Sequence, residues 1–294
     1  MRVLAQRAAL LHAIRRFFHE RGFLEVETPV IVPSPGLDAH LAAFEVRDPR
    51  GASVGWLATS PEYQMKRLLC AGAERLFQLG RSYRADERGP HHEREFTMLE
   101  WYRTNATSDD VIRDTEELVE VCARTVGEVS PFSRPWPRAT VEEALERHAG
   151  VRLEALSNDD ERFYRIWAVD VQPKLGKEQP TVVTDWPASM ASLAKLKPNG
   201  MADRFEAFYQ GVELCNGFGE LTDAAEQRRR FERDRAEREA AGSSVYPMDE
   251  ELLDALARGM PESGGNALGV DRLLMLLVGA ASIQDVMLFP EERL

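Results

Sequence analysis

Residues 77–102 read FQLGRSYRADERGPHHEREFTMLEWY, and this segment carries the clearest structural pattern in the chain. Residues 76–84 and 96–102 alternate between apolar and polar side chains, as β-strands with one buried face do. A polar, charged loop at 86–95 separates them, and loops of that length tend to be functional. The segment therefore predicts two antiparallel strands joined by a long functional connection.

The second strand carries polar groups on its apolar face. Period two places Phe96, Met98, Glu100 and Tyr102 on one side of the strand. A carboxyl group and a phenol among apolar neighbours need hydrogen-bonding partners or a ligand. A binding site satisfies this need, and so does a nearby arginine that pairs with a buried glutamate. The residues alone leave both interpretations open.

The flanking regions predict a mixed architecture. Strand patterns also occur near 181–186 and 205–214, in antiparallel-looking groups separated by helices of uneven length, which favours the α+β class. One domain is expected over 1–294, with a largely helical middle at about 105–180. Helical spacing, caps and glycine stops predict helices over 3–21, 61–70, 108–127, 140–150, 223–240 and 249–259, and a strand end that turns into an apolar helix over 267–278.

A second constellation is the glycine-rich run GVELCNGFGEL at 211–221. Glutamate and glycine are poor strand residues, so their presence suggests a site with close backbone approach. Carboxylates can hold Mg²⁺ beside nucleotide phosphates. Glu213 falls on the opposite face of a regular strand from Asn216 and Glu220, so convergence needs a bulge, which Gly217 and Gly219 can supply. The alternative is an edge strand with solvated acids.

Two shorter patterns add charged groups at helix starts. Arg272 follows Gly269 in the first turn of the terminal helix, where a cation opposes the helix dipole and an anionic partner is suspected. The alternative is an ordinary surface pair between Arg272 and Asp271. Ser60 caps the helix that Pro61 opens, and Glu62 in its first turn usually only complements the dipole.

Composition excludes several classes of protein. The 294 residues hold 37 basic and 49 acidic side chains, so the net charge is −12, which disfavours binding to nucleic acid by general electrostatic attraction. No apolar run reaches eighteen residues, and the N-terminal pattern is amphipathic, so neither a membrane span nor a signal peptide is expected. The three cysteines form no framework, which favours a reducing cytoplasm.

Together these blocks, in this order, resemble the catalytic core of the class II aminoacyl-tRNA synthetases. Residues 22–29 resemble motif 1, residues 77–102 motif 2, and residues 267–272 motif 3. Residues 59–63 and 213–221 are similar to the lysyl branch. The resemblance covers nearly the whole chain and implies an α+β core whose mostly antiparallel sheet is flanked by helices.

The lysyl-tRNA synthetases carry an anticodon-binding OB-fold before this core, whereas the motif 1 helix begins here within the first few residues, so no such domain is expected. The chain thus resembles the synthetase paralogues that attach (R)-β-lysine to a lysine of elongation factor P. The resemblance implies ATP and Mg²⁺ as cofactors, lysine or (R)-β-lysine as substrate, elongation factor P as acceptor, and a C2 homodimer formed through motif 1. A tRNA partner and a membrane are not expected.

The resemblance also implies roles for individual residues. Arg84 and Arg272 should clamp the ends of the triphosphate as catalytic residues. The remaining ATP contacts should come from Asp86, Glu93, Phe96, Glu213, Leu214 and Gly269. Mg²⁺ should be shared by Glu213 and Glu220. The amino-acid pocket should be lined by Ser60, Glu62, Glu100, Tyr102, Asn216, Glu220 and Ala267.

This chain departs from the family pattern at four positions. Asp86 and Glu93 replace a glutamate and an asparagine of motif 2, and Pro90 replaces an arginine. His91, His92 or Arg94 could replace that arginine, and Arg94 or Mg²⁺ could compensate Glu93. Ala267 stands where the synthetases carry glycine, and its methyl group would reshape the amino-acid pocket in favour of a β-amino acid. The alternatives are a stand-alone lysine-activating or tRNA-aminoacylating enzyme, and an inactive paralogue that acts as a binding subunit.

Overall fold

The computed structural model describes residues 2–38, 41–127, 129–157 and 159–294. The predicted strands over 76–84 and 96–102 are confirmed as a hairpin with a long connection. Within the described residues the strands are β1 (Leu24–Glu25), β2 (Ile31–Val32), β3 (Glu45–Arg47), β4 (Ser53–Leu57), β5 (Arg75–Tyr83), β6 (Glu95–Thr104), β7 (Arg138–Thr140), β8 (Thr181–Trp186), β9 (Ala202–Tyr209), β10 (Val212–Gly219) and β11 (Ser263–Gly269).

The predicted helices are confirmed, with shifts at two starts. Thr107 rather than Ser108 caps its helix, because its side chain and that of Asp110 form a reciprocal capping box. The helix predicted to begin at Pro61 with Ser60 as its cap begins one residue later: Pro61 is its N-cap and Glu62 its first residue. The α-helices are α1 (Arg2–Glu20), α2 (Glu62–Cys70), α3 (Ser108–Val126), α4 (Val141–Ala149), α5 (Asp160–Ile166), α6 (Ala224–Ala240), α7 (Glu250–Arg258) and α8 (Val270–Val278).

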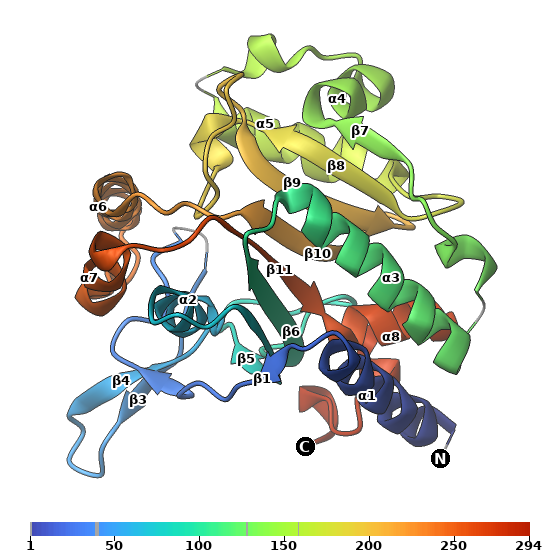
Figure 1. Cartoon of the computed structure of the whole chain (residues 1–294), viewed down its shortest axis with the longest axis horizontal. Helices are drawn as coiled ribbons and strands as arrows, with labels where there is room; N and C mark the ends of the chain where they lie inside the picture. Colours follow the sequence, from blue (N-terminus) through green and yellow to red (C-terminus); the bar gives the residue numbers. More distant parts are fainter. Residues whose placement is uncertain (1, 39–40, 128, 158) are drawn as a thin grey trace.

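In the described part of the chain, eight strands form one sheet in the order β1-β5-β6-β11-β10-β9-β8-β7 (Figure 1). The inner six strands run antiparallel to their neighbours, and β1 and β7 join the two edges in parallel. Strands from the start, middle and end of the chain therefore lie next to one another. This mostly antiparallel sheet flanked by helices confirms the α+β class.

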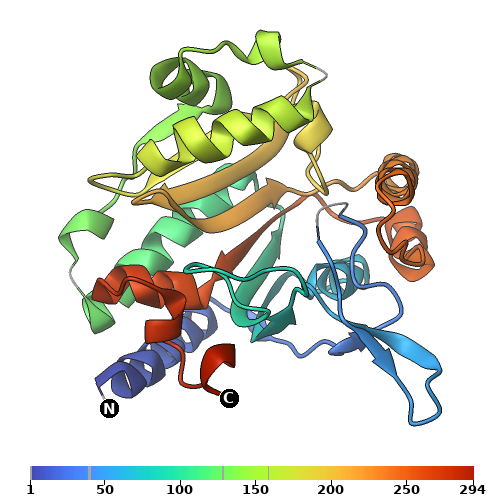
Figure 2. The same cartoon turned by 180° about the vertical axis from the view of Figure 1, so that it is seen from behind.

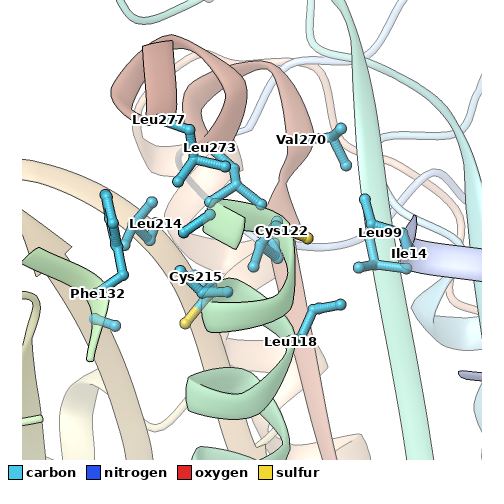
Figure 3. Packing of buried hydrophobic residues seen from close by; sticks show 14 of the residues in the cluster. Ile14, Leu99, Leu118, Cys122, Phe132, Leu214, Cys215, Val270, Leu273 and Leu277 are labelled. Atoms are coloured by element: carbon cyan, nitrogen blue, oxygen red, sulfur yellow. The ribbon is translucent and has the colours of Figure 1, made fainter. Parts of the chain in front are cut away.

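Helices α1, α3 and α8 cover one face of the sheet, as the opposite view also shows (Figure 2). Figure 3 shows Leu118 and Cys122 of α3 packed between Leu273 of α8 and Leu99 of β6. Leu99 and its strand neighbour Trp101 are fully buried in this layer. Because successive side chains alternate across a strand, the even-numbered residues of β6 face the opposite side, where the candidate site lies.

The predicted strand at 205–214 is wrong as a single element. It consists of the end of β9 and the start of β10, joined by a tight turn at Gln210 and Gly211. Both turn residues have positive φ, 52° and 79°. Gln210 is a rare residue type in that conformation, so the apolar pattern continued through the turn without a recognisable signal.

A second, three-stranded sheet in the order β2-β4-β3 was not predicted. Its strands β3 and β4 form the hairpin that projects at the lower left of Figure 1. The strands are short and largely exposed, so they lack the alternation that reveals a half-buried strand. Among the described residues, no helix is both long and apolar enough to cross a membrane.

Candidate active site

A cavity of about 300 Å³ lies on the sheet face that α1, α3 and α8 leave uncovered. Its wall combines β6, β10 and β11 with the segment before α2, the β5–β6 loop and the start of α8. These are the segments that sequence analysis selected separately. The volume lies at the lower end of the range for small-molecule sites.

The floor of the cavity is a row of side chains across four adjacent strands. Glu100 of β6 pairs with Ala267 of β11, which pairs with Asn216 of β10, which in turn pairs with Glu206 of β9. All four residues line the cavity. Ala267 therefore sits between a carboxyl group and an amide, and its small side chain keeps the space above them open. The Oδ1 atom of Asn216 has no hydrogen-bond partner among the residues that the structure describes.

The next row along the strands holds Tyr102, Gly265, Phe218 and Arg204. A Cβ atom on Gly265 would lie 2.3 Å from the Tyr102 ring and 2.4 Å from Oε1 of Glu220. Glycine is therefore required at 265, because any side chain would displace both of these groups.

Glu100 is buried and accepts two hydrogen bonds. The Ser60 hydroxyl donates to Oε1 over 2.6 Å, and the Tyr102 hydroxyl donates to Oε2 over 2.8 Å. Burial raises the pKa of the Glu100 carboxyl to about 7, and the charge of Glu62 adds to the rise while the two hydrogen bonds and Arg84 oppose it. Among the described residues no arginine donates to Glu100, so the alternative of a simple buried Arg–Glu pair is wrong.

A second acidic group lies beside it. Glu62 in the first turn of α2 lines the cavity, and its Oε1 lies 2.8 Å from Nζ of Lys66, one helical turn further on. Nζ of Lys66 also lies 2.5 Å from Oε2 of Glu220. Glu220 is fully buried and lies behind the cavity wall rather than in it. Burial raises its pKa to about 8 against the pull of Lys66, and Glu62 adds to the rise.

The β-bulge expected in β10 is present but lies elsewhere. The register between β10 and β9 shifts between Glu213 and Cys215, not at Gly217 or Gly219. The extra residue brings Glu213, Leu214 and Asn216 to the same cavity. A regular strand would place Glu213 and Asn216 on opposite faces, so the bulge is what joins them in one site.

Arg84 follows β5 at the mouth of the cavity. Its Nη1 donates to Glu87 over 3.0 Å, and its guanidinium lies 5.2 Å from the ring centre of Phe96. Phe96 was expected to stack on adenine, and its ring carries a flat cation here instead. A planar delocalised group thus already uses the face on which a base could stack.

Arg272 of α8 also lines the cavity. Its Nε donates to the His91 carbonyl over 3.0 Å, and its Nη2 lies 2.6 Å from Nε2 of His92. Its Nη1 lies 3.7 Å from the Glu213 carboxylate. Burial and the Arg272 charge lower the pKa of His92, which favours the uncharged ring beside this guanidinium.

The proposed surface pair between Asp271 and Arg272 is wrong. Asp271 is buried and accepts from Arg7 of α1 over 2.6 Å and from the Thr97 backbone of β6 over 2.6 Å. These two bonds fix the first turn of α8 against the sheet. They leave Arg272 directed into the cavity.

The β5–β6 loop differs from expectation at two positions. Of the described residues that line the cavity, Glu87 rather than Asp86 comes from the start of this loop, and Asp86 is exposed. Glu93 lines the cavity and accepts from Gln284 over 2.9 Å. Arg94, expected to compensate Glu93, instead pairs with Glu291 over 3.2 Å.

Glu213 and Glu220, expected to share Mg²⁺, have different partners here. Glu213 faces Arg272, and Glu220 faces Lys66. Within the described residues, no group of three or more His, Cys, Asp or Glu side chains is arranged to hold a metal ion. Glu213 fits Mg²⁺ best, since this ion needs only one or two protein carboxylates when phosphates supply further oxygens.

Two pairs at the site were missed from the sequence. Lys66 stands four residues after Glu62, which is the spacing of an ordinary solvated helix pair. Arg204 and Glu206 form a buried ion pair in the cavity wall. Burial raises the pKa of Glu206 to about 7, while Arg204 opposes the rise and Glu213 adds to it. An arginine directly before the strand predicted at 205–214 and a glutamate two residues later were the available signal for the second pair.

Comparison with known proteins is consistent with this arrangement. A family model described as tRNA synthetases class II (D, K and N) matches residues 1–293. An elongation factor P–(R)-β-lysine ligase of Erwinia tasmaniensis is 43% identical over 310 residues, which cover 99% of this chain and 95% of that protein. Ligases of the same name from Salmonella paratyphi B and Salmonella heidelberg are each 44% identical over 311 residues, with the same coverage.

Proposed function

The chain belongs to the class II tRNA synthetase family of the aspartate, lysine and asparagine type, and we propose that it is an ATP-dependent ligase that activates (R)-β-lysine and transfers it to a lysine side chain of elongation factor P. The names of relatives at 43–44% identity support this acceptor and this substrate. The chain aligns along nearly its full length with these ligases, so the proposal concerns the whole activity.

One observation carries the proposal: the same cavity is lined by two guanidinium groups, those of Arg84 and Arg272, and by the carboxyl groups of Glu62 and Glu100. Two guanidinium groups suit a triphosphate. Two carboxyl groups in a largely buried site suit an amino acid that carries two ammonium groups. A nucleotide and a diamino acid are the pair of substrates that this set of charged groups fits.

The proposed reaction has two steps. A carboxylate oxygen of the amino acid attacks the α-phosphorus of ATP, and the bond to pyrophosphate breaks, which gives an aminoacyl adenylate. The neutral ε-amine of the acceptor lysine then attacks the activated carbonyl carbon. The bond to AMP breaks and the amine loses a proton. No covalent bond to the protein forms, so the protein contributes alignment and charge neutralisation.

The roles of the side chains follow from their places in the cavity. Arg84 and Arg272 would hold the α-phosphate and the γ-phosphate end, and Phe96 would stack on adenine once the Arg84 guanidinium leaves its ring. Leu214, Gly269 and Glu93 would complete the nucleotide site. Glu62, Glu100 and Asn216 would receive the substrate's ammonium groups, with Tyr102 and Ser60 orienting Glu100. Asp86 would contact ATP only after the β5–β6 loop has moved.

Mg²⁺ would be held by Glu213 together with the ATP phosphates, where it would neutralise negative charge. Glu220 would join this ion only if its contact with Lys66 were broken. Removal of divalent cations with EDTA is therefore expected to abolish amino-acid-dependent ATP consumption. Glu213→Gln is expected to raise the Mg²⁺ concentration needed for half-maximal rate, whereas Glu220→Gln is expected to raise the KM for the amino acid.

Pyrophosphate exchange tests the first step of the proposed function. The protein is incubated with ATP, Mg²⁺ and labelled pyrophosphate in the presence of (R)-β-lysine, α-lysine or leucine. Label should enter ATP with the diamino acids and not with leucine. Absence of exchange with every amino acid, together with no ATP binding by calorimetry, would support the alternative of an inactive binding subunit.

The assembly and cellular site are part of the same proposal. Residues 1–294 would act as one catalytic domain, in a homodimer formed through α1 and β1. Leu4 and Leu24, which are exposed on these elements, support such an interface. The unpaired cysteines support a cytoplasmic location, where ATP and the translation machinery are found. Light scattering during size-exclusion chromatography should give twice the chain mass.

A further inference from the structure

Lys66 is the most deeply buried cationic side chain near the cavity. Its side chain is 1% exposed, and it sits on α2 behind the wall that Ser60 and Glu62 form. Nζ lies 2.5 Å from Glu220 and 2.8 Å from Glu62. The side chains of these two partners are 0% and 15% exposed. A lysine so placed does not touch the cavity, yet it contacts a carboxylate that does.

Three carboxyl groups and one ammonium share this corner of the protein. Glu220 is influenced by the charges of both Glu62 and Glu100, so the three acids form one electrostatic group. With all of them ionised, the sum is three negative charges and one positive charge. Burial of uncompensated charge is costly, which is why the pKa values of Glu100 and Glu220 are raised, and two further positive charges would allow all three acids to ionise together. The charge of Arg84 opposes the rise in the pKa of Glu100, but the Arg84 guanidinium donates its hydrogen bond to Glu87.

Which of the three acids Lys66 contacts matters as much as the total charge of the group. Lys66 forms an ion pair with Glu220, the acid that lies behind the cavity wall. It also holds Glu62 from one side, which leaves the other oxygen of Glu62 and the carboxyl of Glu100 for a ligand. Two acceptors therefore face the cavity, and two ammonium groups would balance them. A monoamino acid would leave one buried carboxylate without a partner.

We propose that Lys66 is a positioning residue that neutralises Glu220 and orients Glu62, and thereby makes the cavity select amino acids with two ammonium groups. This inference rests on the proposed function, because it concerns the amino-acid half of the same site. It assigns a role to a residue that contacts neither substrate. Without Lys66, Glu220 would lack its cation, and Glu62 would lose its fixed position.

Lys66→Met removes the charge while keeping most of the volume. The KM for (R)-β-lysine in pyrophosphate exchange should rise by about 30-fold or more, because one partner of a buried charge pair is lost. The KM for ATP should stay within about twofold, since Arg84 and Arg272 are untouched. Lys197→Ala is the control: Lys197 pairs with Asp185 over 3.2 Å outside the cavity wall, and its loss should change neither KM.

Lys66→Ala supports a sharper experiment, because it leaves space for an added amine. Propylammonium in the assay should restore binding of (R)-β-lysine, measured by calorimetry, whereas 1-propanol of similar shape should not. Equal rescue by propanol would mean that Lys66 only fills space and would overturn the inference. Unchanged amino-acid KM in Lys66→Met would overturn it as well, and this variant gives the answer if Lys66→Ala does not fold.

Failure of the proposed function has a different signature. Wild-type protein that binds neither ATP nor any diamino acid would overturn both proposals. Wild-type protein that binds (R)-β-lysine, with the Lys66 variants binding it equally well, would overturn only the role of Lys66.

Discussion

Arg84 makes two contacts that a nucleotide must replace. Its guanidinium is held by Glu87 and lies over Phe96, the ring expected to carry adenine. With Arg84 in its proposed role, binding of ATP would exchange the Glu87 carboxylate for phosphate at this arginine, with a shift of the β5–β6 loop. We therefore expect nucleotide binding to depend on Arg84.

Arg84→Ala should abolish amino-acid-dependent pyrophosphate exchange, with a loss of about 100-fold or more, because a preorganised cation at the reacting phosphate is removed. Exchange measured at saturating ATP checks this result. Arg228→Ala is the matched control, since Arg228 on the outer side of α6 pairs with the exposed Glu250, away from the cavity. Full activity of Arg84→Ala would refute the assigned role.

Ala267 controls the space between Glu100 and Asn216. Ala267→Gly should raise kcat/KM for α-lysine relative to (R)-β-lysine, because removal of the methyl group opens room beside the substrate's amino group. Comparison of the two isomers in pyrophosphate exchange measures the ratio. Because one methyl group changes binding by about 1 kcal/mol, a several-fold change is expected. A ratio equal to that of the wild type would show that Ala267 does not set isomer preference.

The raised pKa of Glu100 predicts that the free energy of unfolding depends on pH. Its pKa is raised from 4.5 to about 7 by burial, so the folded protein binds more protons than the unfolded chain between these values. Protonated Glu100 therefore contributes its full stabilisation of the fold below pH 4.5. This contribution to the free energy of unfolding, roughly 3 kcal/mol, is lost as the pH rises to about 7. Glu100→Gln cannot ionise and should lose less stability over this range, while Glu206 and Glu220, whose pKa values burial also raises, supply the remaining loss. Urea unfolding of both proteins at pH 5 and pH 8 measures the difference, and parallel behaviour would contradict the shift.

The positions of individual side chains were predicted correctly where they follow from the alternation of residues along a strand. Glu100 was placed correctly because alternation along a strand fixes the face of each side chain. Tyr102, expected to line the pocket, shares this face but contacts Glu100 rather than lining the cavity. Lys66 could not be found in this way, because its spacing from Glu62 is equally typical of a solvated helix surface. Its burial results from the packing of α2 against the sheet, and Glu220 is more than 150 positions away in the sequence.

At the scale of elements, the start of α8 is held by a buried ion pair. Asp271→Ala removes the carboxylate that pairs with Arg7, which keeps its bond to the Thr97 hydroxyl, and it leaves the Thr97 backbone N–H without its acceptor. The free energy of unfolding should fall by about 3–5 kcal/mol, as for other buried pairs broken on one side. Urea unfolding measures this value. Arg228→Ala removes an exposed pair and should cost less than about 1 kcal/mol. Equal losses in the two variants would contradict the anchoring role of Asp271.

For strand β10 the sequence predicted that a bulge is present but not where it lies. The spacing of Glu213 and Asn216 required a bulge, and a bulge is present. Its place between Glu213 and Cys215 was not predictable from the glycines, because Gly217 and Gly219 serve other needs: added Cβ atoms there would clash with Phe205 and Asp203. The turn between β9 and β10 was missed for a related reason, since Gln210 occupies a conformation in which glycine or asparagine is usual.

At the scale of the whole molecule, the sheet order explains the site. Strand β11 from the C-terminal part of the chain lies between β6 and β10, so Glu100, Ala267 and Asn216 become neighbours. Local patterns predicted the strands but not their order, because pairing of distant strands leaves no local signal. The resemblance to a known family implied a mostly antiparallel sheet flanked by helices, but no strand order. The acidic surface, with a net charge of −12, fits a protein acceptor better than a nucleic acid.

The central claim is that one cavity joins ATP and a diamino acid and passes the product to a protein. The most direct test is incubation of the chain with ATP, Mg²⁺, purified elongation factor P and each lysine isomer, followed by intact mass measurement. The mass of elongation factor P should increase by one lysyl group with (R)-β-lysine, and Arg84→Ala should give no increase. An unchanged mass with every isomer, while ATP is not consumed, would contradict the claim.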